Sequence, residues 1–183
     1  KYILNNNKKI ANILDIGCGT GVFLNEIRYI DTDIILEGLE FNENARKVAN
    51  QIFTVYEEFT QVNNKYDLIT MIEVIEHLTD PKKFIEGLYC NLNENGKLLI
   101  TTPNINSLKS IIRKEHYSEI NKPFHLVLFS ETSLKILLKN AGFKEIQFIK
   151  YTPFFTKTIV ETAKMKLLQS LNLYGGLFVI AKK

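Results

Sequence analysis

The chain has 183 residues, of which 45% are hydrophobic and 23% charged, and this composition predicts one globular domain over residues 1–183. The formal net charge is only +3 and the lysines are scattered, which argues against nucleic acid or a membrane surface as the partner. The two cysteines provide neither a disulfide framework nor a zinc motif, and no apolar run of 18 residues or signal peptide is visible, so we expect a cytoplasmic protein.

Apolar runs alternate with helical patterns along the chain, which begins at Lys1 and is therefore expected to have an incomplete N-terminus. Short β-branched runs predict strands, and apolar residues at helical spacing predict helices. The expected strands are 9–17, 33–40, 52–59, 65–73, 96–103, 143–151 and 175–183, and the expected helices are 20–30, 42–51, 81–92, 130–142 and 154–172. This alternation predicts an α/β fold with a doubly wound parallel sheet.

The stretch ILDIGCGTG (13–21) places Gly17, Gly19 and Gly21 in a strand-to-helix turn. Glycine permits a sharp turn and close approach of a ligand. The spacing G-x-G-x-G differs from the G-x-G-x-x-G fingerprint of dinucleotide-binding folds. Asp15 precedes the first glycine, and Glu40 ends the next strand, where a carboxylate can accept both hydroxyls of a ribose. A tight turn that binds no ligand is the alternative.

The segment LDIGCGTG resembles the first motif of the class I S-adenosylmethionine (SAM) dependent methyltransferases. The order of elements is also similar, which implies a Rossmann-like, mostly parallel seven-stranded sheet with a reversed last strand. The resemblance implies SAM as the cofactor and Glu40 as its ribose-binding acid. The residues implied to line the SAM site are Asp15, Gly17, Cys18, Gly19, Gly21, Glu40, Phe41, Glu57, Met71 and Ile72, with Glu58 as the alternative to Glu57.

The stretch MIEVIEHLTDP ends the fourth strand and places Glu73, Glu76 and His77 at the edge of the sheet where ligands bind. If a helical turn begins at Glu73, the three side chains share one face. With His125 as a fourth ligand, they would suit a divalent metal such as Mg²⁺ or Mn²⁺. His77 and His125 are alternatively general bases without a metal, and purely structural roles are the third interpretation.

The same stretch resembles a methyltransferase subgroup that includes ubiquinone-pathway, sugar and natural-product enzymes. Together with the later His125, it is also similar to the metal-binding set of small-RNA 3′-end 2′-O-methyltransferases. We therefore expect SAM-dependent O-methylation of a small-molecule acceptor, either a sugar or glycan intermediate or a phenol. The alternatives are a metal-dependent RNA 2′-O-methyltransferase and a non-catalytic SAM-binding scaffold. The sequence specifies no oligomeric state.

Overall fold

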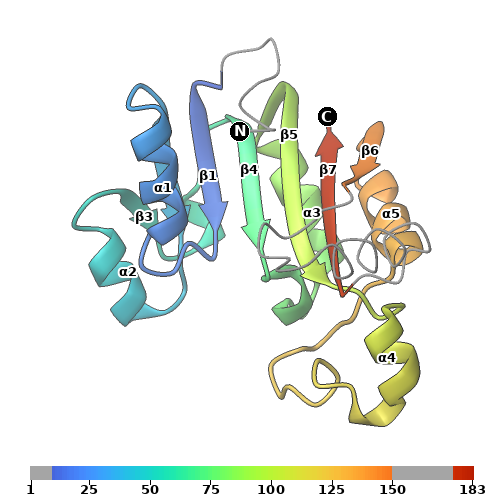
Figure 1. Cartoon of the computed structure of the whole chain (residues 1–183). Helices are drawn as coiled ribbons and strands as arrows, with labels where there is room; N and C mark the ends of the chain where they lie inside the picture. The colour runs from blue at the N-terminus through green and yellow to red at the C-terminus, as the bar shows by residue number, and fades with distance from the viewer. Residues whose placement is uncertain (1–9, 150–174) are drawn as a thin grey trace, which may run out of the picture.

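The structure is a computed structural model that describes residues 10–149 and 175–183 (Figure 1). Its strands are β1 (Asn12–Ile16), β2 (Ile35–Leu39), β3 (Thr54–Tyr56), β4 (Tyr66–Ile72), β5 (Leu92–Pro103), β6 (Glu145–Phe148) and β7 (Gly176–Lys182). Its helices are α1 (Val22–Ile30), α2 (Glu43–Ala49), α3 (Pro81–Cys90), α4 (Leu108–Arg113) and α5 (Glu131–Asn140), with 3₁₀ turns η1 (Phe59–Gln61), η2 (Ile75–His77) and η3 (Lys114–His116). The helix expected at 154–172 lies outside the described residues.

The strands form one sheet in the order β3-β2-β1-β4-β5-β7-β6. Strands β1 to β5 pair in parallel, while β7 runs antiparallel to both β5 and β6. The structure thus confirms the seven-stranded, mostly parallel sheet with a reversed last strand. The parallel strands all end at the lower edge of the sheet in Figure 1, so the loops that follow β1, β2 and β4 meet there.

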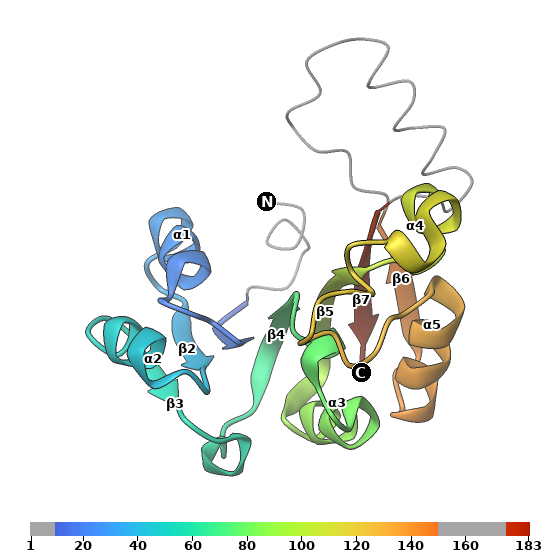
Figure 2. The same ribbon diagram turned by 90° about the horizontal axis from the view of Figure 1, so that it is seen from below.

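Two apolar cores hold helices against opposite faces of this sheet, as the view along the strands shows (Figure 2). One core includes Ile85 and Leu88 of α3 together with Leu134 and Leu138 of α5. The other core contains buried residues of α1 and α2, including Leu24, and packs on the opposite face. Because both faces are covered, the central strands are apolar along most of their length, which is why the sequence pattern revealed them.

Local signals in the sequence define several helix ends. The Asn42 side chain accepts a hydrogen bond from the Ala45 amide and caps α2. Pro81 is the first residue of α3, where its missing N–H costs nothing. Gly142 adopts φ 106° after the last turn of α5, a conformation that glycine accepts readily. These three boundaries agree with the sequence-based expectation.

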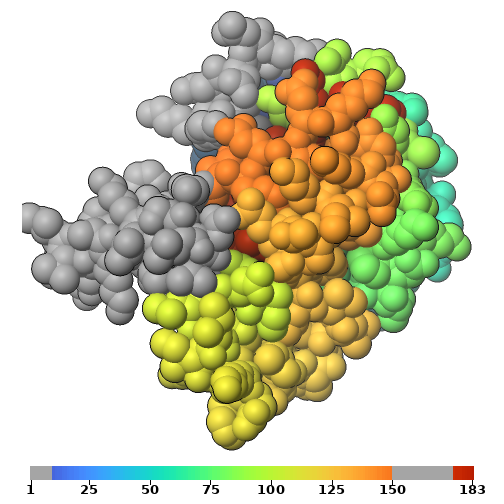
Figure 3. Space-filling model, turned by 90° about the vertical axis from the view of Figure 1, so that its right-hand side faces the viewer, coloured from blue at the N-terminus to red at the C-terminus, as the bar shows by residue number. Residues whose placement is uncertain are grey.

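The segment between β5 and α5 contains α4 and η3. It projects from the lower edge of the sheet as a lobe below α5 (Figures 1 and 3). Phe124 and Leu126, on the part of the lobe that returns to the sheet, are exposed. Across the described ranges, no helix has both the length and the apolar character that crossing a membrane requires.

Candidate functional site

The glycine turn after β1 is fixed to the end of β2 by its backbone. The amides of Gly17 and Cys18 both donate to the Leu39 carbonyl, at 2.7 and 3.1 Å. Gly17 and Gly19 have positive φ angles of 70° and 56°. A Cβ on Gly17 would lie 2.5 Å from the Val74 side chain, whereas a Cβ on Gly19 would meet no described atom within 4 Å. Gly17 is therefore required by packing, and Gly19 borders open space.

Glu40 lies immediately after β2 and faces this turn. Its Oε2 accepts the Gly19 amide at 2.8 Å, and its Oε1 accepts the Asn42 amide at 2.7 Å. An ionised carboxylate offers about four lone-pair positions, so about two stay available for a ligand with two hydroxyls. The open space at Gly19 and the free acceptor capacity of Glu40 fit the ribose of SAM.

Asp15 and Cys18 lie deeper in the same region. Asp15 is 3% exposed and accepts a 2.6 Å hydrogen bond from the Thr70 hydroxyl on β4. Burial raises the pKa of Asp15 to about 7, the Thr70 hydrogen bond opposes this, and the charge of Glu40 adds to it. Burial, with the nearby charges of Asp15 and Glu40, raises the pKa of the Cys18 thiol to about 12. The thiol therefore stays protonated at neutral pH and packs as a small apolar group.

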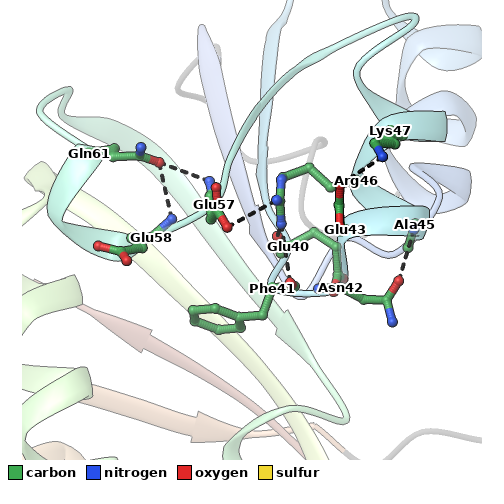
Figure 4. A network of polar contacts seen from close by, with 10 residues as sticks. All are labelled: Glu40, Phe41, Asn42, Glu43, Ala45, Arg46, Lys47, Glu57, Glu58 and Gln61. Atoms are coloured by element: carbon green, nitrogen blue, oxygen red, sulfur yellow. Dashed lines mark hydrogen bonds and ion pairs between the residues drawn. The ribbon is translucent and has the colours of Figure 1, made fainter.

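Arg46 on α2 connects the ends of β2 and β3 (Figure 4). Its guanidinium donates to the carbonyls of Glu40 and Phe41, at 2.8 and 3.1 Å, and forms a 3.1 Å ion pair with Glu57. The Phe41 ring points away from this network and is 55% exposed. Glu57 is therefore partly neutralised by Arg46, while the Phe41 ring is free to cover a ligand.

The end of β4 places Met71 and Ile72 on opposite faces of the sheet. Met71 is fully buried in the core that α3 and α5 cover, and Ile72 is 37% exposed. Of these two, Ile72 presents a surface to a ligand at the edge of the sheet.

Glu76 and His77 lie on η2, and His125 approaches them from the lobe. One ligand atom from each of the three lies within 4.8 Å of the others. The backbone holds this arrangement, because the amides of Leu126 and Val127 both donate to the Glu76 carbonyl. The cluster thus joins residues that are 48 positions apart in the sequence.

The buried carboxylate of Glu76 has one oxygen without a partner. Thr102 on β5 donates its hydroxyl to Oε2 at 2.9 Å. The other oxygen, Oε1, is buried and has no hydrogen-bond partner in the described part of the chain. An unsatisfied carboxylate oxygen in a buried position is costly, so this atom is available to bind a ligand.

Glu73 departs from the expected arrangement. The helical turn begins at Ile75 rather than at Glu73, which has a left-handed φ of 54° and lies outside the cluster of three. Its side chain instead accepts a 3.0 Å hydrogen bond from the Thr101 hydroxyl. Burial and the charge of Glu76 raise the pKa of Glu73, and the Thr101 hydrogen bond opposes this. The expectation of a shared helical face was therefore wrong for Glu73.

Several residues of the site escaped the sequence analysis. Arg46 pairs with Glu57, and Thr102 donates to Glu76. Glu119, in the lobe, has a carboxylate oxygen 3.6 Å from Nδ1 of His125. No periodicity or motif spacing marks them.

The sheet order and the glycine turn facing an acid define the class I SAM-dependent methyltransferase fold. A family model described as a methyltransferase domain matches residues 1–147. The chain therefore belongs to the methyltransferase-domain family.

Curated relatives agree with this assignment. An uncharacterized protein of Methanocaldococcus jannaschii is 30% identical over 155 residues, which is 80% of this chain and 65% of that protein. The mitochondrial ubiquinone biosynthesis O-methyltransferase of Dictyostelium discoideum is 27% identical over 114 residues, 51% of this chain and 35% of that protein. The ubiquinone biosynthesis O-methyltransferase of Coxiella burnetii is 26% identical over 159 residues, which covers 73% of this chain and 67% of that protein. The chain thus spans less than two thirds of the first two relatives.

Solved structures show the same fold. A SAM-dependent methyltransferase from Archaeoglobus fulgidus superposes with a TM-score of 0.71 at 22% identity, covering 100% of this chain and 90% of the other. The plantazolicin methyltransferase BpumL, in complex with a pentazolic desmethylPZN analog and SAH, also has a TM-score of 0.71 at 22% identity. The match covers 100% of this chain and 80% of the other. At 22% sequence identity, the likeness to these two structures shows the fold alone.

Proposed function

We propose that this chain is a SAM-dependent methyltransferase that acts on a hydroxyl oxygen of a small molecule, either a sugar or glycan intermediate or a phenol. One observation carries the proposal. The hydrogen-bonded pair of Gly19 and Glu40 lies at the same edge of the sheet as the cluster of Glu76, His77 and His125. Membership of the methyltransferase-domain family supports methyl transfer. The names of the ubiquinone-pathway relatives support oxygen as the acceptor.

The residues proposed to bind SAM have different roles, which follow from their contacts. Glu40 binds the ribose hydroxyls with its remaining lone pairs, and the backbone around Gly19 lies against the cofactor without a Cβ in the way. Phe41 and Ile72 offer exposed apolar surface for the adenosine. Arg46 keeps the Glu40–Phe41 backbone and Glu57 in place.

SAM supplies the methyl group that forms the new C–O bond as the C–S bond breaks. The acceptor hydroxyl must lose its proton as its oxygen takes up the methyl group, and a residue of the chain must receive that proton. His77 suits this role, because its Nδ1 lies 2.7 Å from the Phe124 carbonyl, which can only accept a hydrogen bond. Nδ1 therefore carries the ring proton, and Nε2 retains the lone pair that a general base needs. The rest of the catalysis is positioning of the acceptor.

Glu76, His77 and His125 also fit a divalent metal such as Mg²⁺ or Mn²⁺. The unpartnered Oε1 of Glu76 supports this part of the proposal, and oxygen with imidazole is a donor set that these cations accept. When bound, such a metal would lower the pKa of a coordinated hydroxyl. Glu73 would stay outside this set of ligands, held by Thr101.

The proposed activity is tested by SAH titration followed by methyl transfer. We expect SAH to bind with one-to-one stoichiometry and labelled SAM to methylate members of a panel of catechols, monophenols and sugars. Glu40→Gln is the matched variant that should bind SAH more weakly. SAH binding without methylation of any acceptor would instead support the SAM-binding scaffold, and failure of SAH to bind to the folded chain would contradict the proposal.

The metal is tested by calorimetric titration of Mn²⁺ into protein saturated with SAH. We expect stoichiometric binding that His125→Ala abolishes and His116→Ala leaves intact, because His116 lies on η3 outside the cluster. No binding to the wild-type chain would remove the metal and leave His77 as the base. The RNA alternative predicts salt-dependent RNA binding, and its absence at low salt would eliminate RNA as the acceptor.

A further inference from the structure

The lobe that carries His125 is tied to η2 by two backbone hydrogen bonds and one from a side chain. The amides of Leu126 and Val127 donate to the Glu76 carbonyl at 2.8 and 3.1 Å, and His77 Nδ1 donates to the Phe124 carbonyl at 2.7 Å. The His77 and His125 rings pack edge to face, with their centroids 4.8 Å apart. The backbone thus places His125 beside His77, but these contacts do not determine which of its ring nitrogens carries the proton.

Glu119 lies next to the ring nitrogen of His125 that has no partner. The His125 side chain is 5% exposed, and its Nδ1 is buried without a hydrogen bond within residues 10–149 and 175–183. Oε2 of Glu119 is 3.6 Å from this Nδ1. That separation is beyond a normal hydrogen bond, and a small shift of either side chain would close it.

Lys122 pairs with the same oxygen of the Glu119 carboxylate that lies near His125. Its ammonium donates to Oε2 of Glu119 at 2.5 Å, while Lys122 itself remains half exposed. This ion pair keeps Glu119 ionised and close to the His125 ring. An ionised carboxylate can accept hydrogen bonds and cannot donate them, so its contact with His125 favours a proton on Nδ1.

We propose that Glu119 is a positioning residue that accepts the Nδ1 proton of His125 and thereby leaves the Nε2 lone pair free for the site. The inference rests on the proposed function, in which His125 serves as a metal ligand or a base. Metal-binding histidines generally donate their second ring nitrogen to a carboxylate or a carbonyl, and removing that partner typically weakens metal binding 10- to 100-fold. Both histidines would then have a free lone pair on Nε2. The Phe124 carbonyl accepts the Nδ1 proton of His77, and Glu119 would accept that of His125.

The first test is independent of any metal. The chain has three histidines, so ¹⁵N-detected NMR of the imidazoles can follow each one, with His116 as an internal reference. In the metal-free wild-type protein we expect His125 to be neutral with its proton on Nδ1, and in Glu119→Ala to become a mixture of both tautomers. A proton on Nε2 in the wild-type protein, or an unchanged tautomer in the variant, would overturn the proposal.

The second test measures Mn²⁺ affinity in the presence of SAH. We expect Glu119→Ala to bind Mn²⁺ about 10- to 100-fold more weakly and Glu119→Gln, which keeps the shape and one acceptor oxygen, to lose less. Glu115→Ala, on η3 of the same lobe, is the matched control and should bind as the wild type does. Equal Mn²⁺ affinity in Glu119→Ala and wild type would count against the positioning role.

The two tests separate the failure of this inference from that of the proposed function. If the wild-type chain binds no Mn²⁺ but the His125 tautomer depends on Glu119, the metal is rejected and the positioning role stands for a base. If Mn²⁺ binds and neither readout changes in Glu119→Ala, the metal site stands and the role of Glu119 is rejected.

Discussion

The amide of Gly19 donates a 2.8 Å hydrogen bond to Oε2 of Glu40, which joins the glycine turn after β1 to the end of β2. Because the Asn42 amide holds the other oxygen at 2.7 Å, the carboxylate is fixed from both sides before a ligand arrives. A preorganised acceptor loses less conformational freedom on binding. The glycine turn and Glu40 therefore act as one binding unit.

Replacing Glu40 with Gln should weaken SAH binding by about 10- to 100-fold, because hydrogen bonds to a charged group contribute about 1.5–3 kcal/mol. The amide also offers one acceptor oxygen where the carboxylate uses two. Calorimetric titration with SAH measures the effect. Glu43→Gln is the control, since Glu43 makes only an exposed pair with Lys47 and should leave the affinity unchanged. Similar SAH affinity in Glu40→Gln and wild type would contradict the assignment.

Gly19→Ala should separate cofactor binding from folding. The left-handed φ of 56° costs alanine about 1–2 kcal/mol, but the added methyl contacts no described atom within 4 Å. We therefore expect a modest loss in the free energy of unfolding and a larger loss of SAH affinity, because the methyl enters the cofactor space. Urea denaturation and SAH titration provide the two readouts. Gly175→Ala, whose added methyl likewise meets no atom of the described residues within 4 Å, is the control and should retain SAH affinity.

Arg46→Met should loosen the ends of β2 and β3 together. It removes two hydrogen bonds to the carbonyls of Glu40 and Phe41 and the ion pair with Glu57. We expect about 1–3 kcal/mol less unfolding free energy and several-fold weaker SAH binding. Lys47→Met on the same helix should change stability by less than about 0.5 kcal/mol, because its ion pair is exposed. Equal effects of the two variants would show that Arg46 has no special role.

Asp15 should make stability depend on pH. Its pKa is raised by burial to about 7 in the folded chain, from 3.8, so the folded state binds its proton more tightly than the unfolded state. Its stabilising contribution is therefore complete below about pH 4 and is lost as the pH rises through about 7, by about 4 kcal/mol at most. Asp15→Asn should remove this loss, as urea denaturation of the cofactor-free protein at several pH values can show. An identical pH dependence of stability in Asp15→Asn and wild type would refute the contribution of Asp15.

The fold was largely predictable because its signals are local. Buried strands such as β4 read as continuous apolar runs, and glycine, proline and cap residues such as Asn42 mark the boundaries within a few positions. Glu40 could be predicted as well, since the end of β2 must lie beside the turn after β1 in a parallel pair. His77 and His125 were named as partners from the chemistry of their side chains.

The amino-acid sequence by itself determined the α/β class, the alternation of strands and helices along the chain and the glycine–acid motif, because these depend on periodicity and on residues with special backbone freedom. Only the tertiary structure decided which polar side chains share the site. It excluded Glu73 from the cluster through a left-handed backbone and the contact with Thr101. It brought Thr102 to Glu76 and Glu119 to His125, because sheet pairing and the returning lobe bring these side chains together without any mark in local sequence.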